Sequence, residues 1–537
     1  MISLKKLSRY YHTLKYVKPI QIRYQIYYRL RKKYREFVKH SYPYIKPSKT
    51  NDLYFSGGIN SYETFFAGQK KREFTFLNLS HSFEDKIDWN FQGYGKLWTY
   101  NLNYFDYLNQ KNISKDHALT LIEEFLSDIE NVKDALEPFP ISLRGINWIK
   151  FLTENKINDS KIDDSLYAQY AILMDNLEYH LLGNHLLENG FSLLFGAYYF
   201  GDEILLQKAK EILIVQLNEQ ILEDGAHFEL APMYHQIMLF RLLDCINLLK
   251  NNQNIFDNKE FLDFLTQKAV LMSGWLLSIT YDNANVPHFN DSTNDIAPSS
   301  KDLFSYAKSL NIEFEKSRLK ECGYRRFDRN GYELIVDVGN IGPDYIPGHA
   351  HSDTFNFELV VDRKGVIVDT GISTYETNER RSLERSTKAH NTVVVNETDQ
   401  SQVWSSFRVA RRAKIVELEE SESEVLATHN GYKRFGVYHT RKFIASNDKV
   451  EIVDKIKSKK DRLFKCVAYF HLHPEIKEIK KEDNKIIINC AILTFKGSIN
   501  IEIADISIAE GYNNLRSSKC IKVTFLNGLE TQINIVK

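Results

Sequence analysis

The strongest constraint on the fold is a change in the spacing of apolar residues near Gly323. Between residues 116 and 310, apolar side chains recur every three or four positions, as they do in residues 239–249. This spacing places them on one face of an α-helix. After Gly323 the apolar residues form short β-rich runs instead. The sequence therefore predicts a helical half followed by a half built from β-strands.

Short polar joints interrupt the helical half. They lie at residues 156–160, 200–203 and 251–254, and each separates two stretches of helical spacing. Polar joints of this length connect neighbouring antiparallel helices. We therefore expect successive helical hairpins in this half of the chain.

The second half is expected to begin as an antiparallel sheet. Its strands are predicted at residues 355–361, 366–370, 392–395 and 486–490. A four-residue turn at residues 362–365 would pair Val361 with Val366, and Glu358 with Asp369.

Length and composition support two large soluble domains. The chain has 537 residues, of which 43% are hydrophobic and 26% are charged, which is typical of a globular protein and too long for a single core. It contains no run of 18 uncharged apolar residues that would span a bilayer. We predict a basic segment over residues 1–50, a helical domain over 51–320 and a sheet domain over 321–537.

The first 50 residues carry an excess of positive charge. They hold 14 Lys and Arg residues and one acidic residue, Glu36, whereas the chain as a whole has no net charge. The charges interrupt every apolar stretch long enough to be a signal peptide, so a cytoplasmic location is expected. The segment is interpreted either as a helix packed on the body, which its irregular apolar stripe favours, or as a contact with the inner membrane surface. No nucleic-acid partner is expected.

Cofactor motifs are absent from the sequence. There is no Walker loop and no GxGxxG motif between a strand and a helix, so no nucleotide cofactor is expected. The five cysteines are scattered without CxxC spacing. This pattern indicates reduced thiols and argues against a disulfide framework or a thiolate zinc site.

Four clusters of polar residues contain candidate functional groups. Asn184 and His185 are adjacent at the start of a helical stretch, where Asn is also a common helix cap. Tyr234 follows a turn rich in titratable residues, and Pro232 fits a first helical turn. The other two clusters are residues 348–353, and residues 368–371 together with 389–392.

Three residues of the last two clusters are ligands of the kind that zinc accepts, namely His351, Asp369 and His390. A straight strand would place His351 about 23 Å from the level of Glu358, at about 3.3 Å per residue. The three side chains meet only if the strand bends or His351 returns on a loop.

Together, these clusters resemble the heparinase II/III family of polysaccharide lyases, which is related to alginate lyases. The resemblance rests on the order of Asn184-His185, residues 224–234, residues 348–353 and residues 389–392. It implies an α+β multidomain fold, with an N-terminal incomplete (α/α) toroid followed by a C-terminal antiparallel β-sandwich.

The resemblance also implies a reaction, β-elimination at a uronic acid of an acidic polysaccharide or oligosaccharide. Asn184 and His349 would neutralise the sugar carboxylate, Tyr234 would act as acid and also as base, and His185 would be its partner base. One structural zinc ion would be held by the trio named above.

Five aromatic residues are candidates for contacts with the sugar, because aromatic faces are typical of carbohydrate sites. They are Trp98, Tyr100, Tyr104, Trp148 and Trp404. The acidic body of the chain disfavours a heavily sulfated substrate. Relatives of this unsecreted kind resemble proteins of surface-polysaccharide biosynthesis, so a capsule, exopolysaccharide or O-antigen glycan is expected.

Two other functions are compatible with the same residues. A glycoside hydrolase on an (α/α) scaffold would use two carboxylates, for which Asp224 and Glu229 are candidates. A non-catalytic glycan-binding scaffold would keep the aromatic surface without the chemistry.

Overall fold

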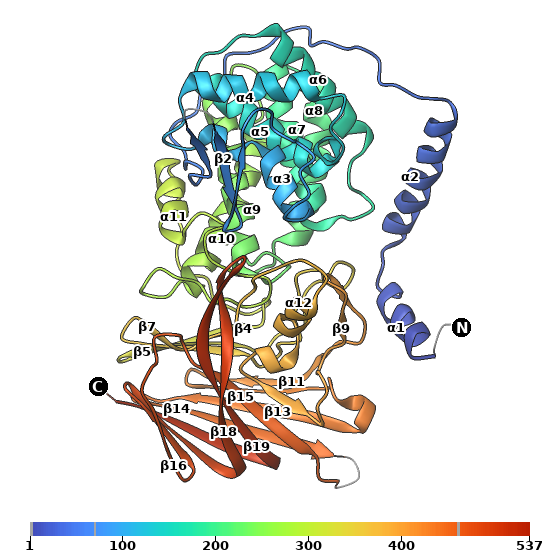
Figure 1. Ribbon diagram of the computed structural model, residues 1–537. Coiled ribbons are helices and arrows are strands. Elements are labelled where there is room, and N and C mark those ends of the chain that lie inside the picture. Colours follow the sequence, from blue (N-terminus) through green and yellow to red (C-terminus); the bar gives the residue numbers. More distant parts are fainter. Residues whose placement is uncertain (1–3, 69–70, 459–461, 537) are drawn as a thin grey trace.

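The structure is a computed structural model that describes residues 4–68, 71–458 and 462–536. A helical half lies above a half made of β-sheets, and two N-terminal helices run along one side of both (Figure 1). The predicted order of a helical region followed by antiparallel sheets is confirmed. Closure of the helices into a toroid stays a prediction.

The helical half contains the helices that the apolar spacing predicts. They are α3 (Lys96–Tyr104), α4 (Lys115–Asp128), α5 (Pro138–Glu154), α6 (Ser160–Asp175), α7 (Gly183–Phe200), α8 (Glu203–Gln220), α9 (Pro232–Asn251), α10 (Lys259–Ile279) and α11 (Ser300–Ser309). The three polar joints fall between α5 and α6, α7 and α8, and α9 and α10.

A small sheet, which the apolar spacing did not predict, precedes these helices within residues 51–320. Its strands are β1 (Phe65–Ala67), β2 (Arg72–Phe76) and β3 (Leu79–Phe83), in the order β1-β2-β3. The turn between β2 and β3 consists of Leu77 and Asn78, both with positive φ. Such two-residue turns match the twist of a hairpin.

The lower half contains two larger antiparallel sheets. One is four-stranded, with β4 (Tyr324–Arg329), β5 (Tyr332–Asp337), β6 (Phe357–Val361) and β7 (Lys364–Ile367) in sequence order. The other has ten strands in the order β11-β12-β13-β14-β19-β18-β17-β16, and β15 pairs with both β19 and β8. Phe357 of the first sheet contacts Phe443 and Phe470 of the second, with ring centroids 5.7 and 6.1 Å apart, so the sheets share one apolar core.

The strands of the ten-stranded sheet and the remaining short elements have the following bounds. They are β8 (Val393–Val395), β11 (Ile415–Glu420), β12 (Glu424–His429), β13 (Val437–Ala445), β14 (Lys449–Ser458), β15 (Lys465–His471), β16 (Ile479–Glu482), β17 (Lys485–Ile488), β18 (Ala491–Gly511) and β19 (Asn514–Ile535), with the pair β9 (Val403–Trp404) and β10 (Arg408–Val409) and the helix α12 (Glu379–Glu384).

The hairpin of β6 and β7 differs from the predicted register. Val361 pairs with Lys364 rather than with Val366, because the turn is two residues long. Its residues, Asp362 and Arg363, have φ of 45° and 65°. Positive φ at both turn residues matches the right-handed twist of the two strands. The hairpin therefore closes with two residues instead of the predicted four.

The chain bends immediately before β6, and this bend brings His351 back toward the sheet. The backbone N–H of Asn356 donates to the Asp353 carbonyl at 2.8 Å, and Phe355 has a φ of 72°. As a result the ring centroid of His351 lies 5.2 Å from that of His390. The straight-strand geometry that would separate these residues is therefore not adopted.

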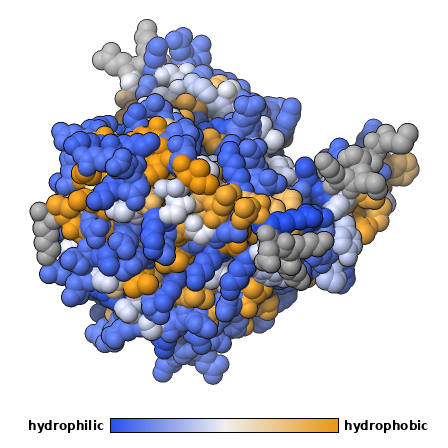
Figure 2. Space-filling view, turned by 90° about the horizontal axis from the view of Figure 1, so that it is seen from below, coloured by the Kyte–Doolittle hydropathy of each residue, from blue (hydrophilic) through white to orange (hydrophobic). Residues whose placement is uncertain are grey.

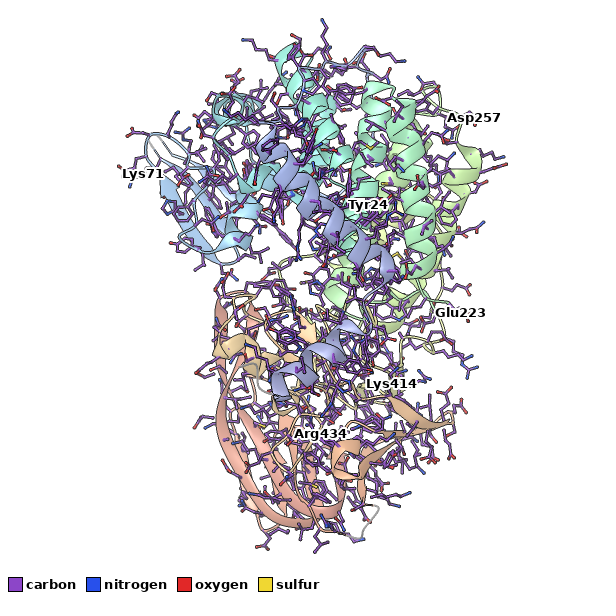
Figure 3. All side chains as sticks on the ribbon, turned by 90° about the vertical axis from the view of Figure 1, so that its right-hand side faces the viewer. Tyr24, Lys71, Glu223, Asp257, Lys414 and Arg434 are labelled. Carbon is purple, nitrogen blue, oxygen red and sulfur yellow. The ribbon has the colours of Figure 1, made fainter. Side chains whose placement is uncertain are left out.

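The basic N-terminal segment forms two helices, α1 (Leu4–Leu14) and α2 (Pro19–Phe37), which we call the N-terminal arm. Figure 3 looks onto the arm, with α2 crossing the helical half at Tyr24 and α1 crossing the sheet half near Lys414. The ring of Tyr24 stacks on Tyr179 at 4.8 Å. The interpretation of this segment as helix packed on the body is confirmed.

Candidate active site

A tight turn before α9 places Tyr234 at the boundary between the two halves. Gly225 has a φ of +92°, and a Cβ added there would lie 2.1 Å from the Leu271 carbonyl oxygen, so only glycine fits. Pro232 occupies the first turn of α9, as predicted, and Tyr234 lies in the same turn. The turn and the proline therefore fix the direction in which the phenol points.

His349 reaches the same place from the sheet half. Its ring packs against that of Tyr234, with centroids 3.9 Å apart and ring planes inclined by 32°. The hydroxyl groups of Tyr234 and Tyr375 lie 3.0 Å apart, and Tyr375 also lies 3.4 Å from Nδ1 of His349. The structure thus brings together a predicted phenol and a predicted imidazole that are more than one hundred positions apart in the chain.

Asp291 organises the sheet side of this site. Its carboxylate accepts hydrogen bonds from Nδ1 of His349 at 2.8 Å and from Nε2 of His351 at 2.7 Å. Both terminal nitrogens of Arg381 also donate to it. Burial alone would raise the pKa of Asp291, but Arg381 and the two histidines hold that pKa well below its usual range. A permanently charged carboxylate behind His349 fixes the orientation of its ring. Sequence reasoning missed Asp291, because it lies in no recognisable motif.

His185 lies at the start of α7 beside a second buried carboxylate. Its Nδ1 lies 3.0 Å from Oε1 of Glu178. Burial opposes the charge on His185, but Glu178 outweighs it and raises the pKa of the imidazole above its usual value. Asn184 is buried next to it and lies inside the helix, whose N-cap is Leu182. The alternative that Asn184 is only a helix cap is therefore wrong.

Glu229 lies close to both histidines. It is 1% exposed, and neither of its carboxylate oxygens has a hydrogen-bond partner within the described residues. Oε2 of Glu229 lies 3.8 Å from Nε2 of His349. Burial raises the pKa of Glu229, whereas the charges of His349 and His185 lower it, with a net upward shift. A protonated Glu229 would present a hydrogen-bond donor toward the site.

A second buried carboxyl, Glu188, also carries a raised pKa. It lies one helical turn after His185 on α7, and burial raises its pKa to about 7 against the opposing charge of Arg241. Buried groups that titrate near neutral pH are typical of catalytic sites.

The pair that the hydrolase alternative assigned, Asp224 and Glu229, is not free for that role, because Asp224 is engaged elsewhere. Asp224 is buried, and its carboxylate accepts hydrogen bonds from the backbone N–H groups of Lys320 and Cys322 at 3.0 and 2.9 Å. These bonds tie the turn before α9 to the start of the sheet half. Asp224 therefore has a structural role, and Glu229 lacks the partner carboxylate that this alternative assigned to it.

Two of the predicted sugar-binding aromatic residues belong to the core. Trp98 and Trp148 are fully buried, and the indole of Trp98 donates to the Leu79 carbonyl at 3.0 Å. Neither ring has a face left for a sugar, so these two predictions are wrong. Apolar spacing alone does not distinguish a core indole from one that lines a cleft.

The other three aromatic candidates differ in their surroundings. Tyr104 is buried, and its ring centroid is 6.0 Å from that of Tyr100, whose hydroxyl bonds to Glu137. Trp404 is covered by α1, because its indole donates to Thr13 at 3.1 Å. The prediction for Trp404 is wrong in this arrangement, Tyr104 has little surface left for a sugar, and Tyr100 is partly exposed.

The predicted metal ligands converge in part. Nδ1 of His390 lies 2.7 Å from Oδ2 of Asp369, so these two residues bond to each other. Nδ1 of His351 and Nε2 of His390 are buried and have no hydrogen-bond partner in the described part of the chain. Within those same residues, no group of three or more His, Cys, Asp or Glu side chains is arranged to hold a metal ion.

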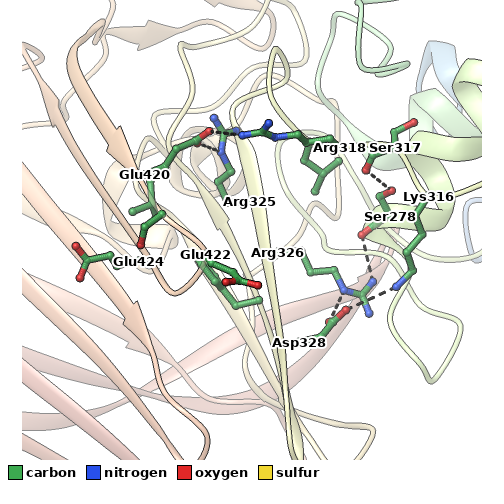
Figure 4. Close-up of a pocket in the computed structure, with 14 residues that line it drawn as sticks. Ser278, Lys316, Ser317, Arg318, Arg325, Arg326, Asp328, Glu420, Glu422 and Glu424 are labelled. Atoms are coloured by element: carbon green, nitrogen blue, oxygen red, sulfur yellow. Dashed lines mark hydrogen bonds and ion pairs between the residues drawn. The ribbon is translucent and has the colours of Figure 1, made fainter.

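A separate cavity lies between the two halves but contains none of the predicted residues. It has a volume of about 550 Å³ and is lined by charged side chains (Figure 4). Arg318 and Arg325 pair with Glu420, and Lys316 and Arg326 pair with Asp328. All four of its cations pair with its own carboxylates, so the site at Tyr234 and His349 remains the candidate.

Comparisons with known proteins identify the family to which both halves belong. The family described as Heparinase II/III N-terminus matches residues 145–314, and the family described as Heparinase II/III-like, C-terminal, matches residues 313–519. A heparin-sulfate lyase of Bacteroides stercoris is 24% identical over 415 residues, which cover 68% of this chain and 58% of that protein. A heparin-sulfate lyase of Pedobacter heparinus is 24% identical over 216 residues, which cover 35% of this chain and 32% of that protein.

The fold is shared with solved structures. The crystal structure of heparinase III superimposes with a TM-score of 0.63 at 16% identity, and covers 84% of this chain and 80% of that chain. The heparan sulfate lyase HepC from Pedobacter heparinus gives a TM-score of 0.55 at 16% identity, over 85% of this chain and 80% of that chain. Adjacent matches to both halves of one family, on a chain with the same order of helices and sheets, lead to one conclusion: this chain belongs to the heparinase II/III-like family of proteins.

Proposed function

We propose that this protein is a polysaccharide lyase that cleaves a uronic-acid-containing glycan by β-elimination. The observation that carries the proposal is the contact between the rings of Tyr234 and His349, which come from different halves and are backed by Asp291. Glu229 lies 3.8 Å from Nε2 of His349, and its pKa is influenced by both His349 and His185. The two heparin-sulfate lyases named above support the same reaction class.

The reaction needs a neutralised sugar carboxylate, a base and an acid. His185 accepts the proton from C5, and the electron pair left behind forms the double bond between C4 and C5. The C4–O bond breaks, and the leaving oxygen takes a proton from Tyr234. Burial raises the pKa of Tyr234 above its usual value, so its hydroxyl is protonated at neutral pH and suits the acid role.

Charge develops on the sugar carboxylate while the C5 proton leaves. Asn184 and His349 stabilise that charge by hydrogen bonding, and the carboxyl group of Glu229 lies 3.8 Å from Nε2 of His349. Donors fixed in place before the reaction lower the barrier more than flexible ones do. Asp291 acts through His349 and is therefore a positioning residue.

The proposal is tested with a panel of uronate polymers and the surface polysaccharide of the source organism, with products identified by mass spectrometry. A product mass equal to the intact repeat, together with ultraviolet absorbance of an unsaturated uronate, is the expected result. A gain of one water would show a hydrolase. Glycan binding without turnover on any polymer would show a scaffold protein.

We further propose that the substrate is a weakly sulfated or unsulfated bacterial glycan of a capsule, exopolysaccharide or O-antigen, and that the protein works in the cytoplasm. The acidic excess beyond residue 50 disfavours a heavily sulfated chain. All five cysteines are free, and four of them are buried, which suits a reducing compartment.

Replacing Glu178 with Gln is expected to move the acidic limb of the pH profile of kcat/KM to lower pH. The carboxylate raises the pKa of His185, and without it the imidazole is deprotonated at lower pH and serves as base there. Initial rates between pH 5 and 9 measure the shift. The exposed Glu130→Gln is the matched control, and identical profiles for both variants would remove His185 from the base role.

We also propose that His351, Asp369 and His390 hold one structural zinc ion. Two buried imidazole nitrogens without partners, Nδ1 of His351 and Nε2 of His390, fit this ion, and Asp291 orients His351 from its other nitrogen, as carboxylates behind zinc ligands commonly do. Asp369 bonds to Nδ1 of His390, so it would join the ion only after that bond breaks. The ion would join the loop of His351 to the sheet and would supply no chemistry to the reaction.

His390→Ala is expected to lower the zinc content and the melting temperature more than it lowers turnover per folded molecule. Metal analysis and thermal unfolding measure the two effects, and the exposed His117→Ala serves as control. Full zinc content with an unchanged melting temperature in His390→Ala would contradict the metal proposal.

A further inference from the structure

The two faces of α2 differ in polarity, and the more polar face is the one that packs on the body. The face that packs on the body is polar and aromatic: the amide of Gln21 donates to the Leu181 carbonyl at 3.0 Å, and the hydroxyl of Tyr28 donates to the Leu177 carbonyl at 2.5 Å. On the same face Arg31 pairs with Asp175 at 2.9 Å. The contacts that hold this helix to the protein therefore come from its polar side chains.

The opposite face of α2 exposes large apolar side chains. Ile22, Ile26, Leu30 and Phe37 are 47%, 53%, 63% and 86% exposed. At 3.6 residues per turn these positions form one stripe, which lies opposite the residues that contact the body. In a surface helix held by packing alone, this stripe would face the core. In the sequence it is obscured, because the tyrosines and arginines of the inner face interrupt it.

Exposed cations border this stripe. Arg23, Arg29 and Lys33 lie on the same outer side of the helix, and Lys32 is exposed beside them. Glu36 is the only acidic residue of the first 50. The outer face of α2 therefore combines an apolar ridge with a strong excess of positive charge.

Helix α1 repeats the arrangement. Tyr10 and Thr13 face the sheet half, where both contact Trp404. Leu7, Tyr11 and Leu14 are exposed on the other side. Both helices lie in front of the body in Figure 3, and from below the arm projects at the right of Figure 2 with hydrophobic residues on its surface. The two outer faces are thus presented on one side of the molecule.

We propose that the outer face of the N-terminal arm binds the surface of an anionic phospholipid bilayer. Apolar side chains at this spacing insert at the boundary of headgroups and acyl chains, and neighbouring Lys and Arg residues attract the lipid phosphates. None of the helices in the described part of the chain combines the length and hydropathy needed to cross a bilayer. The arm therefore lies on the membrane surface.

This inference is independent of the lyase chemistry. The arm lies outside residues 145–519, which match the family, and its outer face contains none of the candidate active-site residues. A nucleic acid would also attract the cations. It would gain little from the exposed Ile26, Leu30 and Phe37, because its outer surface is a phosphate backbone. A bilayer uses both the charge and the apolar ridge.

The test is cosedimentation of the full-length protein with vesicles. Binding is expected to vesicles of 70% phosphatidylcholine and 30% phosphatidylglycerol, and at least tenfold less to vesicles of phosphatidylcholine alone. The double variant Ile26→Ser with Leu30→Ser, and the double variant Arg29→Glu with Lys33→Glu, are each expected to weaken binding to the anionic vesicles at least tenfold. All four residues are exposed, so unchanged melting temperatures are expected.

Matched controls separate the arm from the rest of the surface. Ile204→Ser on α8 and Lys301→Glu on α11 change equally exposed residues elsewhere, and binding is expected to stay unchanged. Turnover of a soluble oligosaccharide is also expected to be the same in all variants, which distinguishes this proposal from the proposed activity. Absent binding to anionic vesicles, or binding to a DNA duplex that the serine variant leaves intact and that exceeds vesicle binding, would overturn the inference.

Discussion

Tyr234→Phe is expected to lower the rate of elimination by at least about 100-fold, the scale of a lost acid-base group. The substitution removes one hydroxyl and keeps the ring that packs against His349. The leaving oxygen then loses the proton donor at this position, and the hydroxyl of Tyr375 lies 3.0 Å away from the place of the missing group. Substrate binding is expected to change little.

Steady-state rates of double-bond formation measure this loss, with kcat and KM determined separately. Tyr54→Phe is the matched control, because Tyr54 is exposed and far along the chain from the site. A fall confined to kcat supports the acid role. Unchanged product formation in Tyr234→Phe would refute the assignment of Tyr234.

Asp291→Asn is expected to destabilise the folded protein by about 3–5 kcal/mol, the cost of leaving a buried charge without its partner. Asp291 is completely buried, and Arg381, which pairs with it, is buried too. The amide keeps the size of the side chain but does not neutralise the guanidinium. It also removes the charged acceptor behind His349, so turnover of the folded fraction is expected to fall as well.

Urea unfolding at neutral pH measures this difference in free energy. Asp505→Asn is a suitable control, because Asp505 pairs with Lys519 at 2.6 Å and the two side chains are 88% and 44% exposed. An exposed pair contributes about 1 kcal/mol or less. Equal losses of unfolding free energy in the two variants would show that Asp291 contributes no more to stability than a surface ion pair does.

The predictable part of the fold followed from local spacing. The run of apolar residues in α9 and the β-rich run in β6 are visible over ten or fewer residues, so the order of helices and sheets was predictable. The short sheet at residues 65–83 was missed, although Phe74 and Phe76 alternate with polar neighbours. The register of the β6–β7 hairpin depends on backbone angles of the turn, which the residue types Asp and Arg do not specify.

Some functional groups carried a visible signal and others did not. Tyr234, His349 and His185 stand in clusters that resemble a known family, and the structure places the first two in contact. Asp291 and Glu178 stand in no motif, because their function is to hold another residue. Trp98 was indistinguishable from a surface aromatic until its neighbours were known.

The sequence by itself determined the types of element and their order, because helical and strand periods are properties of neighbouring residues. It also determined which residue types were available for acid-base chemistry. Only the tertiary structure decided which of them meet, since the contact of Tyr234 with His349 and the ion pair of Asp291 with Arg381 join distant segments. The outer face of the arm was likewise decided in three dimensions, because exposure depends on what a helix packs against and not on its own residues.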